Sequence, residues 1–258
     1  ERAQNLDREG QTAFREAFTP NVGDKILQLS DAATKYEEAA QAWPDSALEE
    51  DALFKIAECH YFADRYPSAT DAYAKLISAY TNTRHLDLVD ARRFEVAWYW
   101  LQLHEADPKR FIQPNVTDRT RPRFDTFGNA IKLFDQIRID DPTGKLADDA
   151  TMAAANAYFE KGKYRRADEL YTDLREVFPS SEHQFQAHLL GLKCKLLEYQ
   201  GPDYDKLPLE EAENLVLAIQ RLFPQENMAH REYIERAHGE VRAQMAERDL
   251  HMARYYER

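Results

Sequence analysis

Two segments of this sequence, 98 residues apart, are near-copies of each other. The first runs from Glu50 to Thr83 and the second from Asp148 to Ser181, so each is 34 residues long. When they are aligned without gaps, small residues and large apolar residues recur at the same places: Ala52 with Ala150, Ala57 with Ala155, Tyr66 with Tyr164, Ala69 with Ala167, Tyr73 with Tyr171 and Leu76 with Leu174. Because a unit this short cannot bury its apolar face alone, the duplication predicts a stack of similar units.

A period of 34 residues is that of the tetratricopeptide repeat, which is a helix–turn–helix unit. The alanines fall where two helices must approach closely, and the aromatic residues fall where one unit fills the gap to its neighbour. We therefore expect an all-α fold: an α-solenoid of about five tetratricopeptide-like helix–turn–helix repeats plus a terminal helix of a truncated sixth. A stack of this kind usually provides a binding surface and rarely an active site.

Proline marks where the second helix of each repeat ends, because its nitrogen cannot donate a hydrogen bond within the helix. These ends fall at Pro44, Pro142, Pro179 and Pro224, and at Thr81, which stands where a proline is expected. The domain prediction is a single solenoid over residues 1–258. Its repeats are expected at about 13–46, 50–83, 84–144, 148–181 and 182–226, followed by a C-terminal helix at 227–258 that has lost its partner helix.

Composition excludes several classes of protein. Apolar residues make up 43% of the chain and charged residues 31%, which fits a folded helical protein and excludes disorder as the main state. The net charge is −12 and no basic stripe occurs, so we expect no nucleic-acid partner. No apolar run approaches the ~20 residues of a membrane-spanning helix. The sequence begins at Glu1 without a Met, so any signal peptide or lipid-bearing cysteine is expected upstream.

Residue types that carry chemistry in other proteins are scattered here. None of the eight histidines forms an i, i+4 pair, and His183 and His188 are five apart and so face different ways on a helix. The sequence has no Gly-rich phosphate loop and no GxSxG motif. We therefore expect no enzyme activity, no catalytic residue, no cofactor and no metal site. The two cysteines, Cys59 and Cys194, are expected to be buried free thiols.

The first helices of such repeats line the concave face of the solenoid, and this face is the expected ligand site. Its aromatic and charged side chains suit an extended peptide, through ring stacking and backbone hydrogen bonds. An empty, solvated groove is the alternative interpretation. The candidate residues on this face are Phe54, Lys55, Glu58, Tyr61, Phe62, Met152, Asn156 and Phe159.

A second candidate is an aromatic patch on the helix predicted at about 86–104. Trp98, Tyr99 and Trp100 are consecutive there, and Phe94 shares a helix face with Trp98. Burial between neighbouring repeats explains most of these rings, and a peptide-docking patch is the alternative. The polar segment 105–123, which contains three prolines, is predicted to be a loop.

The segment Tyr61–Trp100 resembles the BamD family of outer-membrane lipoproteins, also called YfiO or ComL. Members share the pattern Y-x-x-L-x-x-x-Y-P-N-T-R-H-L-D followed by a tyrosine-rich helix. This sequence matches the pattern at Tyr73, Leu76, Tyr80, Asn82, Thr83, Arg84, His85, Leu86 and Asp87. Thr81 departs from it where the family has proline. Similar stretches at 130–150 and 247–258 extend the resemblance over most of residues 31–258.

The resemblance implies a non-enzymatic scaffold of the outer-membrane β-barrel assembly machinery. Its partners would be the barrel-forming assembly subunit and unfolded outer-membrane proteins, at the periplasmic face of the outer membrane. Membrane contact would occur only through an N-terminal lipid anchor that lies outside this chain. The alternatives are a general repeat adaptor in envelope biogenesis or division, or a protein–protein interaction scaffold, in the periplasm or the cytoplasm.

Overall fold

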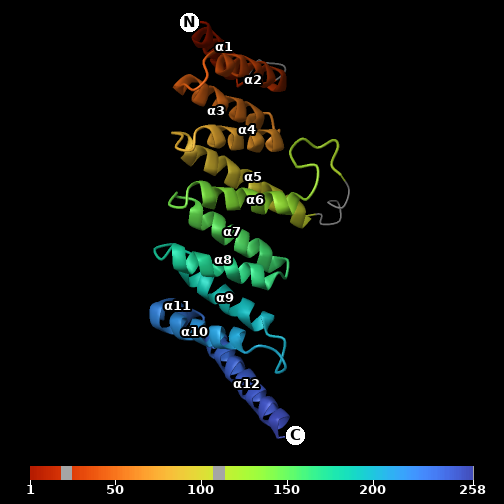
Figure 1. Ribbon diagram of the computed structural model, residues 1–258, viewed down its shortest axis with the longest axis vertical. Coiled ribbons are helices and arrows are strands. Elements are labelled where there is room, and N and C mark those ends of the chain that lie inside the picture. Colours follow the sequence, from red (N-terminus) through yellow and green to blue (C-terminus); the bar gives the residue numbers. More distant parts are fainter. Residues whose placement is uncertain (19–24, 107–113, 258) are drawn as a thin grey trace. The chain divides into compact units, whose positions relative to one another are not determined.

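The computed structural model describes residues 1–18, 25–106 and 114–257 (Figure 1). These residues form twelve α-helices and no strand, which confirms the predicted all-α fold of tetratricopeptide-like hairpins. The chain divides into two compact units, Glu1–Leu146 and Ala147–Arg258, called unit 1 and unit 2 below. The expected single solenoid over residues 1–258 concerns how these two units are joined, and it stays a prediction.

Unit 1 consists of three helical hairpins that pack in chain order. Its helices are α1 (Arg2–Glu16), α2 (Lys25–Ala42), α3 (Ala47–Phe62), α4 (Tyr66–Ala79), α5 (Leu86–Ala106) and α6 (Thr126–Asp140). The first hairpin starts earlier than the predicted repeat at 13, because α1 also packs on α2 through its N-terminal half. At Gly10 an added Cβ would lie 3.0 Å from the ring of Tyr36, so the glycine lets α1 approach α2 closely.

Unit 2 repeats the hairpin arrangement and ends in a long helix. Its helices are α7 (Ala147–Glu160), α8 (Tyr164–Val177), α9 (Gln184–Glu198), α10 (Leu207–Leu222), α11 (Pro224–Ala229) and α12 (Arg231–Tyr256). The predicted C-terminal helix at 227–258 is in fact divided, because His230 leaves the helical conformation between α11 and α12. Ile234 and Val241 on α12 are fully buried against α10 and α9, whereas Tyr255 and Tyr256 are exposed.

The duplicated residues form the core of both units. Five of the six aligned pairs have no solvent exposure at either position: Ala52 and Ala150, Ala57 and Ala155, Ala69 and Ala167, Tyr73 and Tyr171, and Leu76 and Leu174. The sixth pair, Tyr66 and Tyr164, is half-buried at the start of the second helix. The alanines allow the two helices of a hairpin to pack at close range, as the sequence predicted.

The turn inside the duplicated hairpin also has the same backbone shape twice. Asp64 between α3 and α4 has φ 56°, and Gly162 between α7 and α8 has φ 68°. This left-handed conformation suits glycine and is tolerated by aspartate better than by most residues. The same turn can therefore form from two different residues.

The insertion after α5 is an ordered loop where it is described. Residues 107–113 of the predicted loop lie outside the described residues, and Glu105 and Ala106 belong to α5. In the remainder, the Asn115 amide donates to the carbonyl oxygens of Asp118 and Arg121, at 2.5 and 2.9 Å. The indole Nε1 of Trp100 donates to the carbonyl of Thr120 at 2.8 Å, which fixes the loop to α5.

Two further expectations concern cysteines and membrane helices. Cys59 and Cys194 are both buried and both free, as predicted. Within the described residues, no helix has the length and apolar character needed to cross a lipid bilayer.

A buried charge group joins α5 to α6 in unit 1. The Arg93 side chain is 1% exposed, and its Nη1 lies 2.6 Å from Asp140 Oδ2 and 3.6 Å from Asp90 Oδ1. One guanidinium therefore serves two carboxylates and lies closer to Asp140. Burial, which the nearby Arg93 opposes, raises the pKa of Asp90 to about 7.

This shift predicts a pH dependence of stability for unit 1. Folded Asp90 keeps its proton up to about pH 7, whereas the unfolded chain releases it near 3.8. Folding therefore takes up a proton between these values, and Asp90 makes the free energy of unfolding fall as the pH rises through that range. Asp90→Asn stays neutral, so its stability relative to wild type should improve between about pH 4 and pH 7 and stay constant above that range.

Urea titrations followed by tryptophan fluorescence measure this directly, because Trp43, Trp98 and Trp100 all lie in unit 1. Asp87→Asn, an exposed carboxylate on the same helix, is the matched control and should show no such trend. If the free energy of unfolding changed with pH in the same way for wild type and Asp90→Asn, the raised pKa of Asp90 would be contradicted.

Candidate functional site

A continuous row of aromatic rings lies on unit 1. Neighbouring ring centroids are 5.1 to 6.0 Å apart, and most pairs meet edge-on or tilted. The row draws on α1 and the turn after it, on α3, on the start of α4 and on α5. We call this set the aromatic row: Phe14, Phe18, Phe62, Tyr61, Tyr66 and Tyr99.

Two cations lie over the rings of this row. The Arg92 guanidinium carbon is 4.4 Å from the centroid of Tyr61 and 5.2 Å from that of Phe62. The Lys55 ammonium is 5.5 Å from the centroid of Phe14. All three distances are within the range of cation–π attraction. The surface therefore combines apolar ring faces with fixed positive charge.

A buried acid beneath the row holds Arg92 in place. Glu58 is 5% exposed and accepts hydrogen bonds from the Tyr73 hydroxyl at 2.5 Å and from Arg92 Nε at 3.2 Å. Arg92 Nη1 also donates to Glu95 at 3.1 Å, and the Tyr61 hydroxyl donates to the same carboxylate at 2.5 Å. Burial and then the Glu95 contact raise the pKa of Tyr61, so its hydroxyl keeps the proton that it donates.

The bonds between α3 and α5 repeat at one sequence interval. Glu58 and Arg92, and Tyr61 and Glu95, are each 34 residues apart, which is the length of the repeat. The same interval separates Asp51 from His85, whose Nε2 lies 2.8 Å from Asp51 Oδ1. The period read from the sequence is therefore the register in which successive first helices contact each other.

The junction between α4 and α5 fixes that register. The Thr83 hydroxyl donates to Glu50 at 2.6 Å, and the Arg84 backbone amide donates to the same carboxylate at 3.1 Å. The His85 ring stacks on Phe54 with centroids 4.1 Å apart and planes 4° apart. Burial raises the pKa of Asp51, but hydrogen bonds from Arg84 and His85 outweigh it and lower the pKa below its usual value.

The five candidates predicted on α3 divide into two groups. Lys55, Tyr61 and Phe62 are half-buried and reach the surface of the aromatic row. Phe54 is 3% exposed and Glu58 is buried, so these two support the row from beneath. Their roles in ligand binding stay predictions.

Sequence reasoning missed five members of this surface, namely Phe14, Phe18, Tyr66, Arg92 and Glu95. Phe14 and Phe18 lie in the predicted repeat at 13–46, outside the two duplicated segments, and have no counterpart to align with. Arg92 and Glu95 could have been found, because each lies 34 residues after a predicted candidate.

The predicted patch of Trp98, Tyr99 and Trp100 is not one surface. Trp98 is 49% exposed, whereas Trp100 is 2% exposed and holds the insertion loop. Tyr99 belongs to the aromatic row, since it meets Tyr66 edge-on at 5.4 Å. Three consecutive helical residues must point in three directions, about 100° apart, so this division follows from helix geometry.

Unit 2 carries the predicted candidates Met152, Asn156 and Phe159 on α7. Met152 is 4% exposed, and Asn156 accepts a hydrogen bond from the Tyr171 hydroxyl at 2.7 Å. Phe159 is half-buried and meets Tyr164 edge-on at 5.4 Å. The Tyr171–Asn156 bond occupies the place of Tyr73–Glu58 in unit 1, but Leu190 stands where unit 1 has Arg92.

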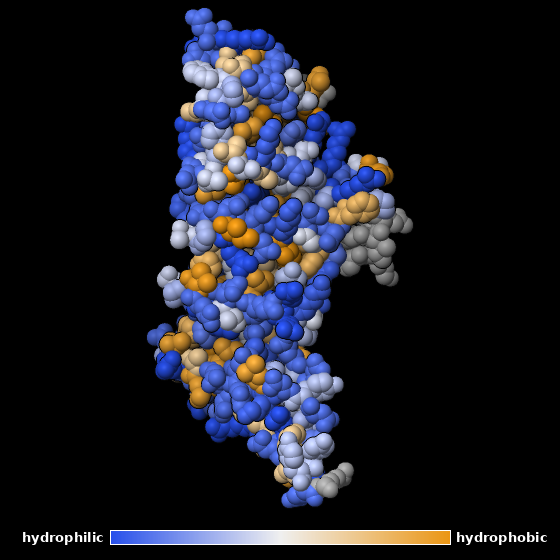
Figure 2. All heavy atoms as spheres, viewed as in Figure 1, coloured by the Kyte–Doolittle hydropathy of each residue, from blue (hydrophilic) through white to orange (hydrophobic). Residues whose placement is uncertain are grey.

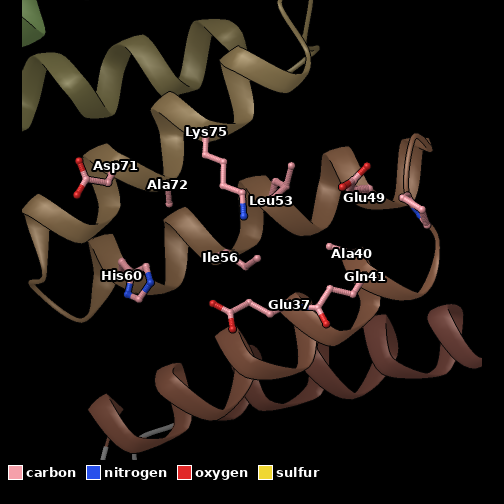
Figure 3. Close-up of a pocket in the computed structure, with 11 residues that line it drawn as sticks. Glu37, Ala40, Gln41, Glu49, Leu53, Ile56, His60, Asp71, Ala72 and Lys75 are labelled. Carbon is pink, nitrogen blue, oxygen red and sulfur yellow. The ribbon is translucent and has the colours of Figure 1, made fainter.

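A hollow of about 690 Å³ lies on the other side of α3 (Figure 3). Leu53, Ile56 and His60 share one face of α3, opposite the face that bears Lys55 and Phe62. Figure 3 shows Lys75 of α4 extending over the same hollow, which Glu37 of α2 and Asp71 of α4 also line. Its lining is mixed in charge and carries no row of rings, so the aromatic row is the stronger candidate for ligand binding.

The face drawn in Figure 2 is mainly hydrophilic, and its apolar residues form small separate groups. Scattered apolar residues are normal on protein surfaces and need no partner. The continuity of the aromatic row is what distinguishes it from them.

Comparisons with known proteins support the repeats. The family model of the tetratricopeptide repeat matches residues 51–83 and 149–181, which are the α3–α4 and α7–α8 hairpins with their junctions. No curated protein matches the sequence significantly. A crystal structure of nearly identical TPR-like repeats, described as a kinesin light chain from Podospora anserina, is 12% identical to this chain. That match covers 86% of this chain and 99% of the other, with a TM-score of 0.34.

The chain therefore contains tetratricopeptide repeats, and these imply a protein–protein interaction scaffold. Folds of this kind are typically non-enzymatic. Membership of the BamD family is a narrower statement, and it stays a prediction.

The duplicated tyrosine gives a matched stability prediction. Tyr73→Phe removes a donor from the buried Glu58, whereas Tyr171→Phe removes one from the amide of Asn156. Hydrogen bonds to charged groups contribute about 1.5–3 kcal/mol, and those between neutral groups about 0.5–1.5 kcal/mol. We expect Tyr73→Phe to destabilise unit 1 more than Tyr171→Phe destabilises unit 2.

Native-state hydrogen exchange resolves the two effects, because amides of α3 and α7 report on different units. Equal losses of protection would show that Glu58 does not act as a charged acceptor.

Proposed function

We propose that this chain is a non-enzymatic scaffold that binds an extended segment of a partner protein on the aromatic row of unit 1. The main support is that six rings from α1, the turn after it, α3, α4 and α5 are in continuous contact, with the Arg92 and Lys55 cations over them. Aromatic and arginine side chains supply most of the energy at protein interfaces. Tetratricopeptide repeats, which imply protein binding, support the same proposal.

The chemistry of the row indicates what the segment contains. Side chains on one side of an extended peptide recur about every 6.6 Å, close to the spacing of the rings, 5.1 to 6.0 Å. A peptide with apolar or aromatic residues at alternate positions can therefore place successive side chains against successive rings. Lys55 and the half-exposed Glu95 flank the rings and can bind backbone or charged groups of the peptide.

Selected peptides test this proposal without a known partner. Peptides chosen from a random library on the immobilised full chain should carry apolar residues at alternate positions. Tyr61→Ala should weaken their binding, measured by fluorescence anisotropy, by about fivefold or more, because truncated aromatic anchors cost more than about 1 kcal/mol. Phe159→Ala is the matched control, since Phe159 has the same place in unit 2.

Circular dichroism should confirm that both variants keep their helices. Peptides that lose affinity for Phe159→Ala and keep it for Tyr61→Ala would place the site on unit 2 and refute the proposal.

For the partner itself, we propose the outer-membrane β-barrel assembly machinery. The scaffold would bind the barrel-forming subunit and unfolded barrel precursors at the periplasmic face of the outer membrane, held by a lipid anchor outside this chain. The N-T-R-H-L-D stretch at 82–87 supports this through its resemblance to the BamD family. Thr83, Arg84 and His85 of this stretch bond the α4–α5 junction to Glu50 and Asp51 on α3, so the motif also has a structural role. A general adaptor of the envelope or the cytoplasm is the second candidate.

Crosslinking in cells distinguishes these candidates. A photoreactive amino acid in place of Tyr61 should form adducts with unfolded outer-membrane proteins if the assembly role holds. Adducts with other proteins alone would refute the assembly role and leave the aromatic row as a binding surface. Absence of any adduct, with efficient crosslinking from Phe159, would refute both.

A further inference from the structure

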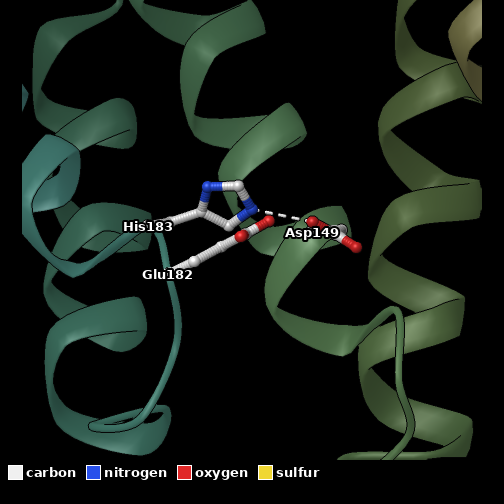
Figure 4. A group of neighbouring side chains, drawn as sticks. All are labelled: Asp149, Glu182 and His183. Carbon is white, nitrogen blue, oxygen red and sulfur yellow. Dashed lines mark hydrogen bonds and ion pairs between the residues drawn. The ribbon is translucent and has the colours of Figure 1, made fainter.

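Three potential metal ligands converge in unit 2. Asp149 lies in the first turn of α7, while Glu182 and His183 lie at the junction before α9. His183 Nε2 is 2.7 Å from Asp149 Oδ1, and one donor atom from each of the three residues lies within 4.8 Å of the others. Figure 4 shows the Glu182 carboxylate directed toward the His183 ring and Asp149.

The duplicated segment of unit 1 supplies an internal comparison. The equivalent residues there are Asp51, Arg84 and His85, each 98 positions earlier. The histidine–aspartate contact is the same, with His85 Nε2 2.8 Å from Asp51 Oδ1. In unit 1, however, the third residue is an arginine whose Nε lies 3.1 Å from Asp51 Oδ1 and 3.5 Å from His85 Nε2.

Unit 1 therefore has a permanent cation beside its aspartate–histidine pair. The Arg84 guanidinium forms an ion pair with Asp51. Burial raises the pKa of Asp51, but Arg84 and His85 outweigh burial and lower that pKa. In unit 2 the same position carries Glu182, which brings a second carboxylate to the pair. The exchange removes one positive charge and adds one negative charge at a place where unit 1 holds a cation.

We propose that Asp149, Glu182 and His183 bind a divalent transition-metal ion, for which Zn²⁺ is the best fit. One imidazole nitrogen and carboxylate oxygens are established zinc ligands, at about 2.0–2.2 Å. The imidazole makes Mg²⁺ and Ca²⁺ poor candidates, because both ions prefer ligand sets made only of oxygen. With three protein ligands, water would complete the tetrahedron.

The geometry requires only small side-chain movements. Two ligands of one tetrahedral zinc ion lie about 3.4 Å apart, and the three donor atoms already lie within 4.8 Å of one another. Glu182 is exposed and can adjust by side-chain rotation. The ion would replace the histidine–aspartate hydrogen bond, whose proton leaves to solvent. His183 Nε2 and Asp149 Oδ1 then separate only from 2.7 Å to about 3.4 Å, so the backbone can stay as it is.

The ion would link the start of α7 to the start of α9, as Arg84 links the equivalent elements of unit 1. Unit 2 would then gain stability from the metal, because an ion bound only by the folded state stabilises that state. Sequence analysis expected no metal site because it examined the spacing of histidines along single helices. The ligands here come from the first turn of α7 and from the junction before α9, and Asp149 and His183 are 34 residues apart in the sequence.

Equilibrium dialysis of the full chain with Zn²⁺ tests the proposal. We expect one ion per chain to bind far more tightly than any others, without displacement by a large excess of Mg²⁺ or Ca²⁺. Glu182→Arg should lower that affinity by more than about tenfold, the lower limit for residues that merely support metal ligands. This variant is expected to fold, because it reproduces the arrangement at Arg84.

The reverse substitution is a matched gain-of-function test. Arg84→Glu gives unit 1 the residues of unit 2, so a second Zn²⁺ should bind. Zn²⁺ should also slow hydrogen exchange at the starts of α7 and α9 in the wild type and leave it unchanged in Glu182→Arg. Tight zinc binding that survives Glu182→Arg, or no tight binding in the wild type, would overturn the proposal.

Discussion

Contacts between side chains 34 residues apart organise both units. A hairpin of two helices has an apolar face that it cannot cover, so its position depends on how the next hairpin packs against it. Alanines with no solvent exposure let the helices approach, but alanine packing alone does not select one register. The histidine–aspartate contact selects the register, because His85 contacts Asp51 and His183 contacts Asp149 at nearly equal distances. The apolar core therefore lets the helices pack closely, and the histidine–aspartate contact at the junction between hairpins fixes their register.

The two copies keep this framework and differ in the charges placed on it. Unit 1 has Glu58, Arg92 and Glu95 in a network under and beside the aromatic row. At the equivalent places, unit 2 has Asn156, Leu190 and Lys193. All of these residues except the buried Glu58 are half-buried or exposed, and none belongs to the alanine core, so they can change without disturbing it. The same fold thus presents a cation-bearing aromatic surface in one unit and an acidic, histidine-containing junction in the other.

The sequence predicted the fold well because the fold depends on features that recur. Alanine and tyrosine positions that match across 98 residues must satisfy the same packing, and five of the six aligned pairs are fully buried. The candidate site was predicted less completely. Position in a repeat placed Lys55, Tyr61 and Phe62 on the surface but could not separate them from the buried Phe54 and Glu58. Whether a residue of α3 is buried or exposed depends on which side chains of the α4–α5 junction and of α5 cover it, as the His85 ring covers Phe54.

The same reasoning explains why the acidic junction escaped sequence analysis. Residues that match between two copies indicate shared structure, whereas residues that differ at matched places indicate where the copies have separate roles. Arg84 and Glu182 are such a pair, and the charge reversal has meaning only because the aspartate and histidine around it are the same. A lone acidic residue on a helical protein of net charge −12 would carry no information. Set against its counterpart, it marks a place where one unit has its own cation and the other needs one from solution.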